Sequence, residues 1–348
     1  MIIAITFPTS AAFWLNYSSK HDLISFSLTN RKLVFLPDKY DFHLNAADAM
    51  AIAEAFDLPL PLTLIAPEAE RRYNNKNVNT LVRHRQFPKD SFVELSHDFC
   101  LPDGNACRIL VASPEMTFLQ SAYLLDPRAA TILGCELCGT YIYDANAEFC
   151  QRSRQVITSS EEIRKFIERN AGCAGVKQAR SISRYISDGS NSRMETQLSI
   201  LANLRFPYGG YKLAEHKLNI TPHLSEEAKA SLGNRNIFCD MVWEKEKVVV
   251  EYDSDLTHLS SKQHMLDVRR ANALQRSGYT VFTITKNDVS SLSHLDRTFM
   301  TIRKELKMRN AESKLVQYES RRRELMQVFR TFKSHDMSTY SIWKRRRK

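Results

Sequence analysis

The sequence lacks several features that would assign a common function directly. Its 348 residues include only ten glycines, which form no P-loop and no dinucleotide-binding motif, so a nucleotide-binding protein is disfavoured. It also contains no Ser-His-Asp signature of a hydrolase. No apolar run is long enough to span a bilayer, and we expect no membrane anchor. The sequence shows no internal repeat and no low-complexity segment.

Cysteine is present, but not in the pattern of a disulfide-bonded fold. The seven cysteines are an odd number, and the first residues, MIIAITFPTSAAFWLNY, lack the basic region and cleavage site of a secretion signal. We therefore expect reduced thiols in a cytoplasmic protein. Cys135 and Cys138 form one CxxC pair with no second ligand pair, which favours buried helix thiols over a structural zinc site.

Positive charge is in excess only near the end of the chain. The formal net charge is +10, and residues 296–348 hold sixteen Lys and Arg against six Asp and Glu. The rest of the chain carries 33 charges of each sign. A basic segment attracts polyanions, so we expect a nucleic-acid partner, with DNA favoured. The alternatives are a solvated helix face and packing of this segment onto its own domain.

The length of the chain and its 43% apolar residues fit two ordinary domains. Residues 1–150 mix short strand and helix patterns, which predicts a small α/β domain. Residues 151–190 begin with an amphipathic helix, end in a polar loop and are predicted to be a helical linker. Residues 191–295 follow the order helix, strands, helix, strand, and residues 296–348 continue as a basic helical tail. The expected fold class is α/β (α+β).

Two strands of the third segment carry acids among apolar residues. IFCDMVW, a polar turn and KVVVEYD predict a β-hairpin. Asp240 lies between apolar neighbours, and the short turn brings it beside Glu251 on the facing strand. Strand side chains alternate with period two, so Asp253 shares a face with Glu251. Buried carboxylates that lie close together repel each other and lose hydration, which costs stability.

This arrangement predicts a metal site, whereas the alternative is a strand that ends in a polar loop. Asp240 and Glu251, with a third carboxylate from Asp253 or Glu195, suit Mg²⁺ or Mn²⁺, which prefer oxygen ligands. Such a metal polarises a phosphodiester and lowers the pKa of a bound water. His258, in the loop after the strand, is placed to accept the proton of that water.

The helix that follows adds a second signal. Asp267, Arg270 and Leu274 are spaced i, i+3 and i+7, so they share one helix face. Leu274 is expected to bury against the sheet, which places Arg270 near the acids. There it pairs with a carboxylate or binds a phosphate. The alternative is a surface ion pair between Asp267 and Arg270. Gly278 is predicted to end this helix.

Four blocks of the second half occur in a familiar order: METQL, FCDMVW, VVVEYDSDLTH and DVRRANALQRSG. They resemble the PD-(D/E)XK restriction-endonuclease-like superfamily, and within it the branch of the very-short-patch mismatch-repair endonucleases. The resemblance covers about residues 190–290. It implies a mixed central sheet flanked by helices, with Asp240 and Glu251 as metal ligands and Glu195 as an acid near the site.

One position departs from the superfamily pattern. A lysine usually stands two residues after the Glu and steadies the attacking hydroxide, whereas this chain has Asp253. The very-short-patch branch lacks that lysine and relies on histidine, which points to His258, and Lys286 is a second candidate substitute. The resemblance implies a metal-dependent endonuclease in bacterial defence or repair. The departure favours the alternative, a non-catalytic DNA-binding regulator or antitoxin with a nuclease-like fold.

The first half is similar to another family in four blocks: SAAFWL, LVRHRQFPKDSFVEL, VASPEMTFLQSAYLL and LGCELCGTY. These blocks look like the AbiEi-type antitoxin-related domain that often precedes a nuclease-like domain in bacterial proteins. This resemblance implies a small α/β unit over residues 1–150. In that family a winged-helix DNA-binding domain often comes first, but the sequence shows no convincing helix-turn-helix pattern.

Overall fold

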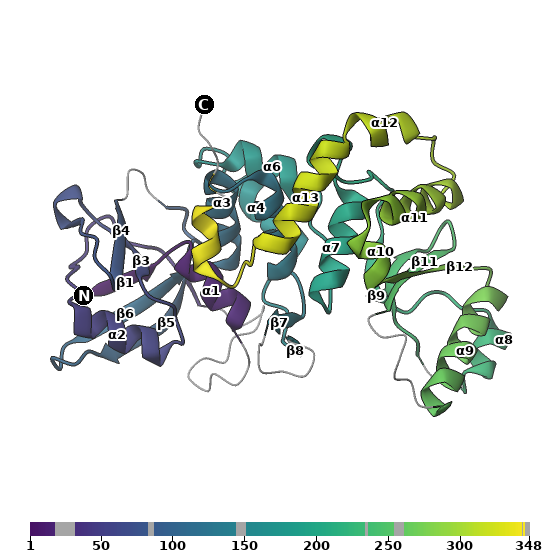
Figure 1. The fold of residues 1–348 in the computed structure, drawn as a ribbon. Helices are drawn as coiled ribbons and strands as arrows, with labels where there is room; N and C mark the ends of the chain where they lie inside the picture. The colour runs from purple at the N-terminus through teal and green to yellow at the C-terminus, as the bar shows by residue number, and fades with distance from the viewer. Residues whose placement is uncertain are drawn as a thin grey trace. The chain divides into compact units, whose positions relative to one another are not determined.

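The computed structural model describes residues 1–17, 32–82, 87–143, 151–233, 236–253, 261–342 and 344 (Figure 1). The chain forms two compact units, of which the first comprises Met1–Ile186 with Thr331–Lys348 and the second comprises Ser187–Arg330. Each unit combines helices with a mixed sheet, which confirms the predicted α/β class. The second unit is therefore contiguous in sequence, whereas the first is built from two segments.

The first unit contains a six-stranded mixed sheet within its described residues. Its strands lie in the order β2 (Leu33–Val34), β5 (Phe92–Cys100), β6 (Ala106–Ala112), β1 (Ile2–Ile5), β3 (Leu62–Ala66) and β4 (Val78–Val82). β1 is parallel to β6 and β3 to β4, whereas β1 and β3 are antiparallel. β1 and β3 are short apolar runs with almost wholly buried side chains, as expected for central strands. A separate hairpin joins β7 (Tyr141–Tyr143) and β8 (Gln151–Ser153).

Helices pack together in the rest of the first unit. They are α1 (Thr9–Asn16), α2 (Ala46–Ala55), α3 (Pro114–Leu124), α4 (Pro127–Leu137), α5 (Ser160–Arg169) and α6 (Val176–Ser183), with the 3-10 turns η1 (Ala69–Arg71) and η3 (Met337–Ser341). Ser113 and Asp126 cap α3 and α4, and a proline follows each cap, which fixes both helix starts. Cys135 and Cys138 are buried at the end of α4, as predicted for this CxxC pair.

Residues 151–190, predicted as a helical linker, contain two packed helices. α5 buries Ile163, Phe166 and Ile167 on one face, and both α5 and α6 contact α3. An amphipathic stripe stabilises a helix mainly when another element covers it, and here the covering helix comes from an earlier part of the chain. The segment up to Ile186 therefore belongs to the first unit.

The second unit contains a four-stranded sheet within its described residues. Its strands lie in the order β12 (Thr280–Thr285), β11 (Val248–Asp253), β10 (Cys239–Trp243) and β9 (Lys217–Ile220). β9, β10 and β11 are antiparallel neighbours, whereas β11 and β12 are parallel and are connected through α9 (Ser261–Arg276). Gly278 adopts a φ of 81° just after α9 and ends this helix as predicted.

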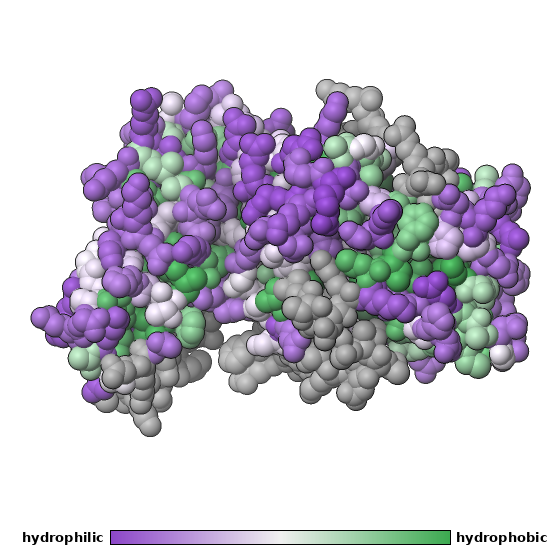
Figure 2. Space-filling view, turned by 180° about the vertical axis from the view of Figure 1, so that it is seen from behind, coloured by the Kyte–Doolittle hydropathy of each residue, from purple (hydrophilic) through white to green (hydrophobic). Residues whose placement is uncertain are grey.

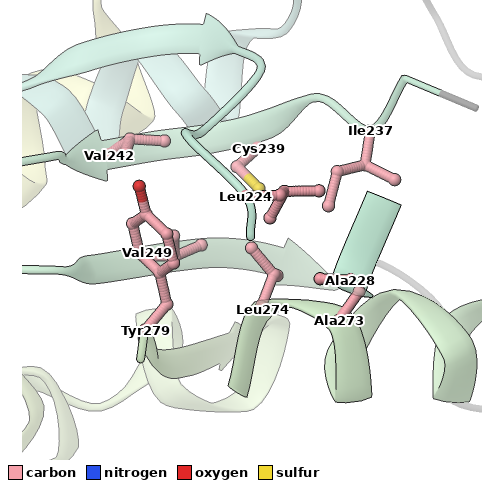
Figure 3. Packing of buried hydrophobic residues seen from close by; sticks show 9 residues of the cluster. All are labelled: Leu224, Ala228, Ile237, Cys239, Val242, Val249, Ala273, Leu274 and Tyr279. Atoms are coloured by element: carbon pink, nitrogen blue, oxygen red, sulfur yellow. The ribbon is translucent and has the colours of Figure 1, made fainter. Parts of the chain in front are cut away.

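An apolar cluster joins α8 (Glu226–Ser231) and α9 to the sheet (Figure 3). Its buried members are Leu224, Ala228, Ile237, Cys239, Val242, Val249, Ala273, Leu274 and Tyr279. Leu274 is buried here, as its spacing in the helix predicts. Full burial of a leucine contributes about 1.5–3 kcal/mol, so this contact helps to fix α9 against the strands that carry the acids.

Residues 296–330, part of the predicted basic tail, pack within the second unit. The remaining elements of this unit are α7 (Arg193–Asn203), η2 (Phe206–Tyr208), α10 (Lys286–Ser290), α11 (Leu292–Glu305), α12 (Glu312–Gln317) and α13 (Glu319–Thr331). Phe299 of α11 stacks on Tyr211, with ring centroids 4.3 Å apart. Arg322 of α13 is buried, and its Nε lies 2.8 Å from Asp296 Oδ1. These contacts favour the packing alternative for this part of the segment.

The face shown in Figure 2 is mainly hydrophilic, with smaller apolar areas between the polar side chains. The most exposed large apolar side chains of the described residues are those of Val316, Ile342 and Phe238. Phe238 directly precedes β10 and thus lies close to the acids of the hairpin. Within the described part of the chain, no helix has both the length and the apolar character needed to cross a membrane.

Candidate functional site

The β10–β11 hairpin brings Asp240 and Glu251 together. Met241 pairs with Val250 across the two strands, and one step further along this register Asp240 stands opposite Glu251. Directly opposed residues of an antiparallel pair have Cβ atoms about 4.5–5.5 Å apart. The short turn between the strands therefore places the two predicted metal ligands side by side.

Two hydrogen bonds cross between the strands at this step. The Asp240 amide donates to Glu251 Oε2 at 3.4 Å, and the Tyr252 amide donates to Asp240 Oδ2 at 2.7 Å. Each carboxylate is thus bound to a backbone N–H group of the opposite strand. Because the sheet fixes both strands, these bonds also limit the orientations of the two carboxylates.

Arg270 of α9 is the cation paired with this acid pair. Its Nη2 lies 2.7 Å from Glu251 Oε1 and also donates to the carbonyl of Phe238. The sequence leaves two roles open for Arg270, pairing with a carboxylate or binding a phosphate. The contact with Glu251 corresponds to the first of these. The side chains of Arg270 and Glu251 are 32% and 17% exposed, so solvent screens the pair only in part. Asp267 lies on α9, and its side chain is outside the described part of the structure.

Glu195 lies in the first turn of α7, where Ser192 caps the helix by accepting from the Glu195 amide at 3.1 Å. The Glu195 carboxylate reaches back, and its Oε2 accepts from the Asn191 amide at 2.7 Å. The same oxygen accepts from the side-chain amide of Asn219. This buried acid is therefore held by three segments, the start of α7, the turn before it and β9.

Glu195 is buried, and Asp240 and Glu251 are half-buried. Burial raises the pKa of Asp240, Glu251 and Glu195 above the ordinary values. The charge of Asp240 adds to the increase at Glu251 and at Glu195, whereas the Arg270 guanidinium opposes it at Asp240 and Glu251. Burial, and after it the charge of Glu251, raises the pKa of the Cys239 thiol to about 12. Asp240 is thus electrostatically coupled to both other carboxyl groups.

The donor set of this site fits a hard divalent cation. Asp240 and Glu251 offer carboxylate oxygens, and Mg²⁺ is usually bound through one or two carboxylates together with waters and substrate phosphates. A divalent ion would also offset the repulsion between these carboxylates. Among the residues that the structure describes, no group of three or more His, Cys, Asp or Glu side chains is arranged to hold a metal ion. Among the described residues, a metal at this site would therefore have two carboxylate ligands, those of Asp240 and Glu251.

The other predicted site residues lie at the end of β11 or beyond it. Asp253 is the last residue of β11 and pairs with Thr285 of the parallel strand β12. Lys286 follows Thr285 as the first residue of α10 and is exposed. The register therefore places Asp253 and the candidate substitute lysine at the same edge of the sheet. His258, the predicted proton acceptor, lies outside the described residues.

Asn219 is a neighbour of the site that the sequence analysis does not identify. It lies in β9 with a φ of 50°, and its side-chain amide donates both to Glu195 Oε2 and to the carbonyl of Gly189. Asparagine adopts the left-handed region more readily than most other residues. A lone asparagine near the end of a strand pattern is the sequence signal that could have pointed to this position.

Comparisons of the chain with protein-family models, with curated proteins and with solved structures find no match. The resemblance to the PD-(D/E)XK superfamily therefore rests on the four sequence blocks of the second half. The resemblance to the AbiEi-type domain likewise rests on the four blocks of the first half. Independently of both, the structure places Asp240 opposite Glu251 with Arg270 beside Glu251, and the charge of Asp240 contributes to the raised pKa of Glu195.

Proposed function

We propose that the chain is a metal-dependent endonuclease that hydrolyses phosphodiester bonds of nucleic acid, with DNA as the expected substrate. The observation that carries this proposal is the position of Asp240 directly across the hairpin from Glu251. The charge of Asp240 also raises the pKa of Glu195, which couples the third acid to this pair. Acids whose pKa values are shifted by partial burial and by a nearby charge are frequent at functional sites. The order of the four sequence blocks and the basic segment near the end of the chain support the same function.

Asp240 and Glu251 would hold Mg²⁺ or Mn²⁺ through their carboxylate oxygens. Bound there, the metal supplies Lewis-acid polarisation of the phosphodiester and lowers the pKa of a coordinated water. The chain orients both carboxylates through backbone N–H groups of the opposite strand. Glu195 adds a third negative charge from α7, which favours a cation at this position.

Further residues assist at the end of β11. Asp253 contributes another carboxylate at the edge of the sheet, and Lys286 is exposed at the same edge, where its ammonium group would steady a developing anion. His258 takes the role of proton acceptor for the attacking water. In the structure without a metal, Arg270 binds Glu251 and limits the orientations of this carboxylate.

A non-catalytic DNA-binding regulator or antitoxin is the second candidate function. Two observations favour it: Asp253 stands where the superfamily usually has lysine, and the Arg270 guanidinium already neutralises Glu251. In that case the ion pair would serve the stability of the fold and the basic segment would serve binding. The same fold supports an endonuclease and a non-catalytic regulator, so a measurement of nucleic-acid cleavage is needed to distinguish the two functions.

A nicking assay tests the proposal. The chain is incubated with supercoiled plasmid, linear duplex, single-stranded DNA or RNA, in Mg²⁺, in Mn²⁺ or in EDTA. We expect cleavage with a metal, none in EDTA, and a loss of about a hundredfold or more in Asp240→Asn and Glu251→Gln. Glu244→Gln removes an acid from the turn of the same hairpin, where Glu244 pairs with Lys217, and is expected to keep full activity.

Two outcomes would contradict the proposal. Cleavage that survives in Asp240→Asn would place the active site elsewhere. If no substrate is cleaved with either metal, yet one duplex is bound selectively, the regulator replaces the nuclease.

A further inference from the structure

Both carboxylate oxygens of Glu251 already have partners in the structure. Oε1 accepts from Arg270 Nη2 at 2.7 Å, and Oε2 accepts from the Asp240 amide at 3.4 Å. A guanidinium and a divalent cation on one carboxylate oxygen repel each other at short range. A metal that binds Glu251 through Oε1 must therefore compete with Arg270.

The charges around the site are unbalanced. Asp240, Glu251 and Glu195 together carry up to three negative charges, and the Arg270 guanidinium contributes one positive charge beside them. The side chain of Glu251 is only 17% exposed, so water screens this excess weakly. One guanidinium therefore offsets only part of the negative charge that a divalent ion would meet at this site.

Arg270 keeps another partner when it leaves Glu251. Its Nη2 also donates to the carbonyl of Phe238, the residue that directly precedes β10. The guanidinium also interacts with the Cys239 thiol, which is a weak hydrogen-bond partner. A rotation of the guanidinium that keeps the bond to the Phe238 carbonyl would therefore free Glu251 without leaving Arg270 unpartnered.

We propose that Arg270 is the exchangeable counter-cation of the acidic site: a divalent metal binds Glu251 by displacing the guanidinium, which then stays on the Phe238 carbonyl. This inference rests on the proposed function and adds how its site is regulated. The folded chain without metal is held by the ion pair. Metal binding is weakened by the same ion pair, so the site is filled only when the metal concentration is high enough to displace it.

Direct measurement of Mn²⁺ binding to the folded chain, by calorimetry or electron paramagnetic resonance, tests this exchange without any cleavage assay. Arg270→Gln removes the competing charge and is expected to tighten Mn²⁺ binding by about tenfold, and to lower the thermal stability in EDTA. Arg269→Gln removes an exposed positive charge from the neighbouring position of α9 and is expected to leave both quantities unchanged.

Arg270→Lys tests the same point if Arg270→Gln does not fold. Lysine keeps the charge but loses the forked geometry that binds the Glu251 carboxylate. A Mn²⁺ affinity of Arg270→Lys above that of wild type therefore supports the exchange. Weaker Mn²⁺ binding than wild type in a folded Arg270 variant would overturn the exchange and leave the metal site in place. No Mn²⁺ binding by wild type or any variant would overturn the exchange and the proposed metal site together.

Discussion

Tyr279 is a buried polar residue in the core of the second unit. Its side chain belongs to the apolar cluster of α8, α9 and the sheet, and the residue is 3% exposed (Figure 3). The Lys247 ammonium lies 4.4 Å from the ring centroid, but the hydroxyl has no hydrogen-bond partner among the described residues. A buried hydroxyl without a partner costs about 1–3 kcal/mol, so the ring contributes stability and the hydroxyl removes some of it.

Tyr279→Phe is therefore expected to raise the free energy of unfolding by about 0.5–2 kcal/mol. The matched control is Tyr211→Phe, because the Tyr211 hydroxyl donates to Asp296 Oδ1 at 2.7 Å, and its loss is expected to cost about 1–2 kcal/mol. Urea denaturation of both variants measures the difference. A Tyr279→Phe chain that is less stable than wild type by more than about 1 kcal/mol would mean that the hydroxyl has a partner.

Asp240→Asn is expected to raise the melting temperature in EDTA while abolishing metal-dependent activity. The substitution removes the charge that raises the pKa of both Glu251 and Glu195, and the amide oxygen can still accept from the Tyr252 amide. Thermal unfolding with and without EDTA measures the effect, with Glu244→Gln as the control. A lower melting temperature than wild type in EDTA would show that the Asp240 charge stabilises the fold even without a metal.

At the scale of secondary-structure elements, a charged cluster links β5 to β6. Glu94 of β5 lies 2.8 Å from Arg108 Nε on β6 and also contacts Lys32 and His97. Burial of Glu94 acts to raise its pKa, but the hydrogen bonds from the three basic side chains outweigh burial and lower the pKa from 4.5 to about 2. The ionised form of Glu94 is therefore preferred more strongly in the folded chain than in the unfolded one.

This difference predicts an acid-dependent loss of stability. Because the folded pKa is the lower one, Glu94 stabilises the fold above about pH 4.5, and this contribution is lost as the pH falls towards about 2. Glu94→Gln is expected to cost about 2–3 kcal/mol at pH 7, and its difference from wild type is expected to shrink across that window. Denaturation at a series of pH values measures this, with Glu54→Gln, at an exposed position of α2, as the control. A difference that stays constant from pH 7 to about 2 would contradict the assignment.

Local signals account for the elements that the sequence analysis predicted correctly. The alternation in β10 and β11, the spacing of Leu274 and the position of Gly278 all lie within one hairpin or one helix. Such local signals do not identify the partner of Arg270. Its position on the same face of α9 as Leu274 is compatible with a carboxylate partner or with a phosphate. Asn219 was missed because its contact with Glu195 joins a strand to a helix cap 24 residues earlier.

At the scale of the whole molecule, composition alone leaves open which segments pack. The polar loop and the charges of the sequence predict a linker at residues 151–190 and a basic tail at 296–348, with packing of that tail as the alternative. In the structure, α5 and α6 pack on α3, and Arg322 is buried against Asp296. These contacts join segments that are far apart in sequence, and a charge count does not separate a buried arginine from a solvated one.

The last residues of the chain remain the candidate for contact with nucleic acid. Arg345–Lys348 carry four positive charges, and a deletion that starts there spares Lys344, which forms an isolated bridge with Leu125. This deletion is expected to weaken binding to DNA of any sequence about equally and to reduce the slope of log K against log salt by up to about 4. Fluorescence anisotropy over a series of salt concentrations measures the slope. An unchanged slope would assign these residues to solubility or packing.

The interrupted sequence of the first unit also sets an order of assembly during translation. Phe332 and Tyr340 are buried in that unit, and the Tyr340 ring meets Phe7 with centroids 5.0 Å apart. The ribosome therefore completes the whole of Ser187–Arg330 before it releases the residues that finish the unit begun at Met1. The part of the molecule synthesised first is completed last, so a polypeptide that stops at Arg330 has every residue of the second unit and an unfinished first one.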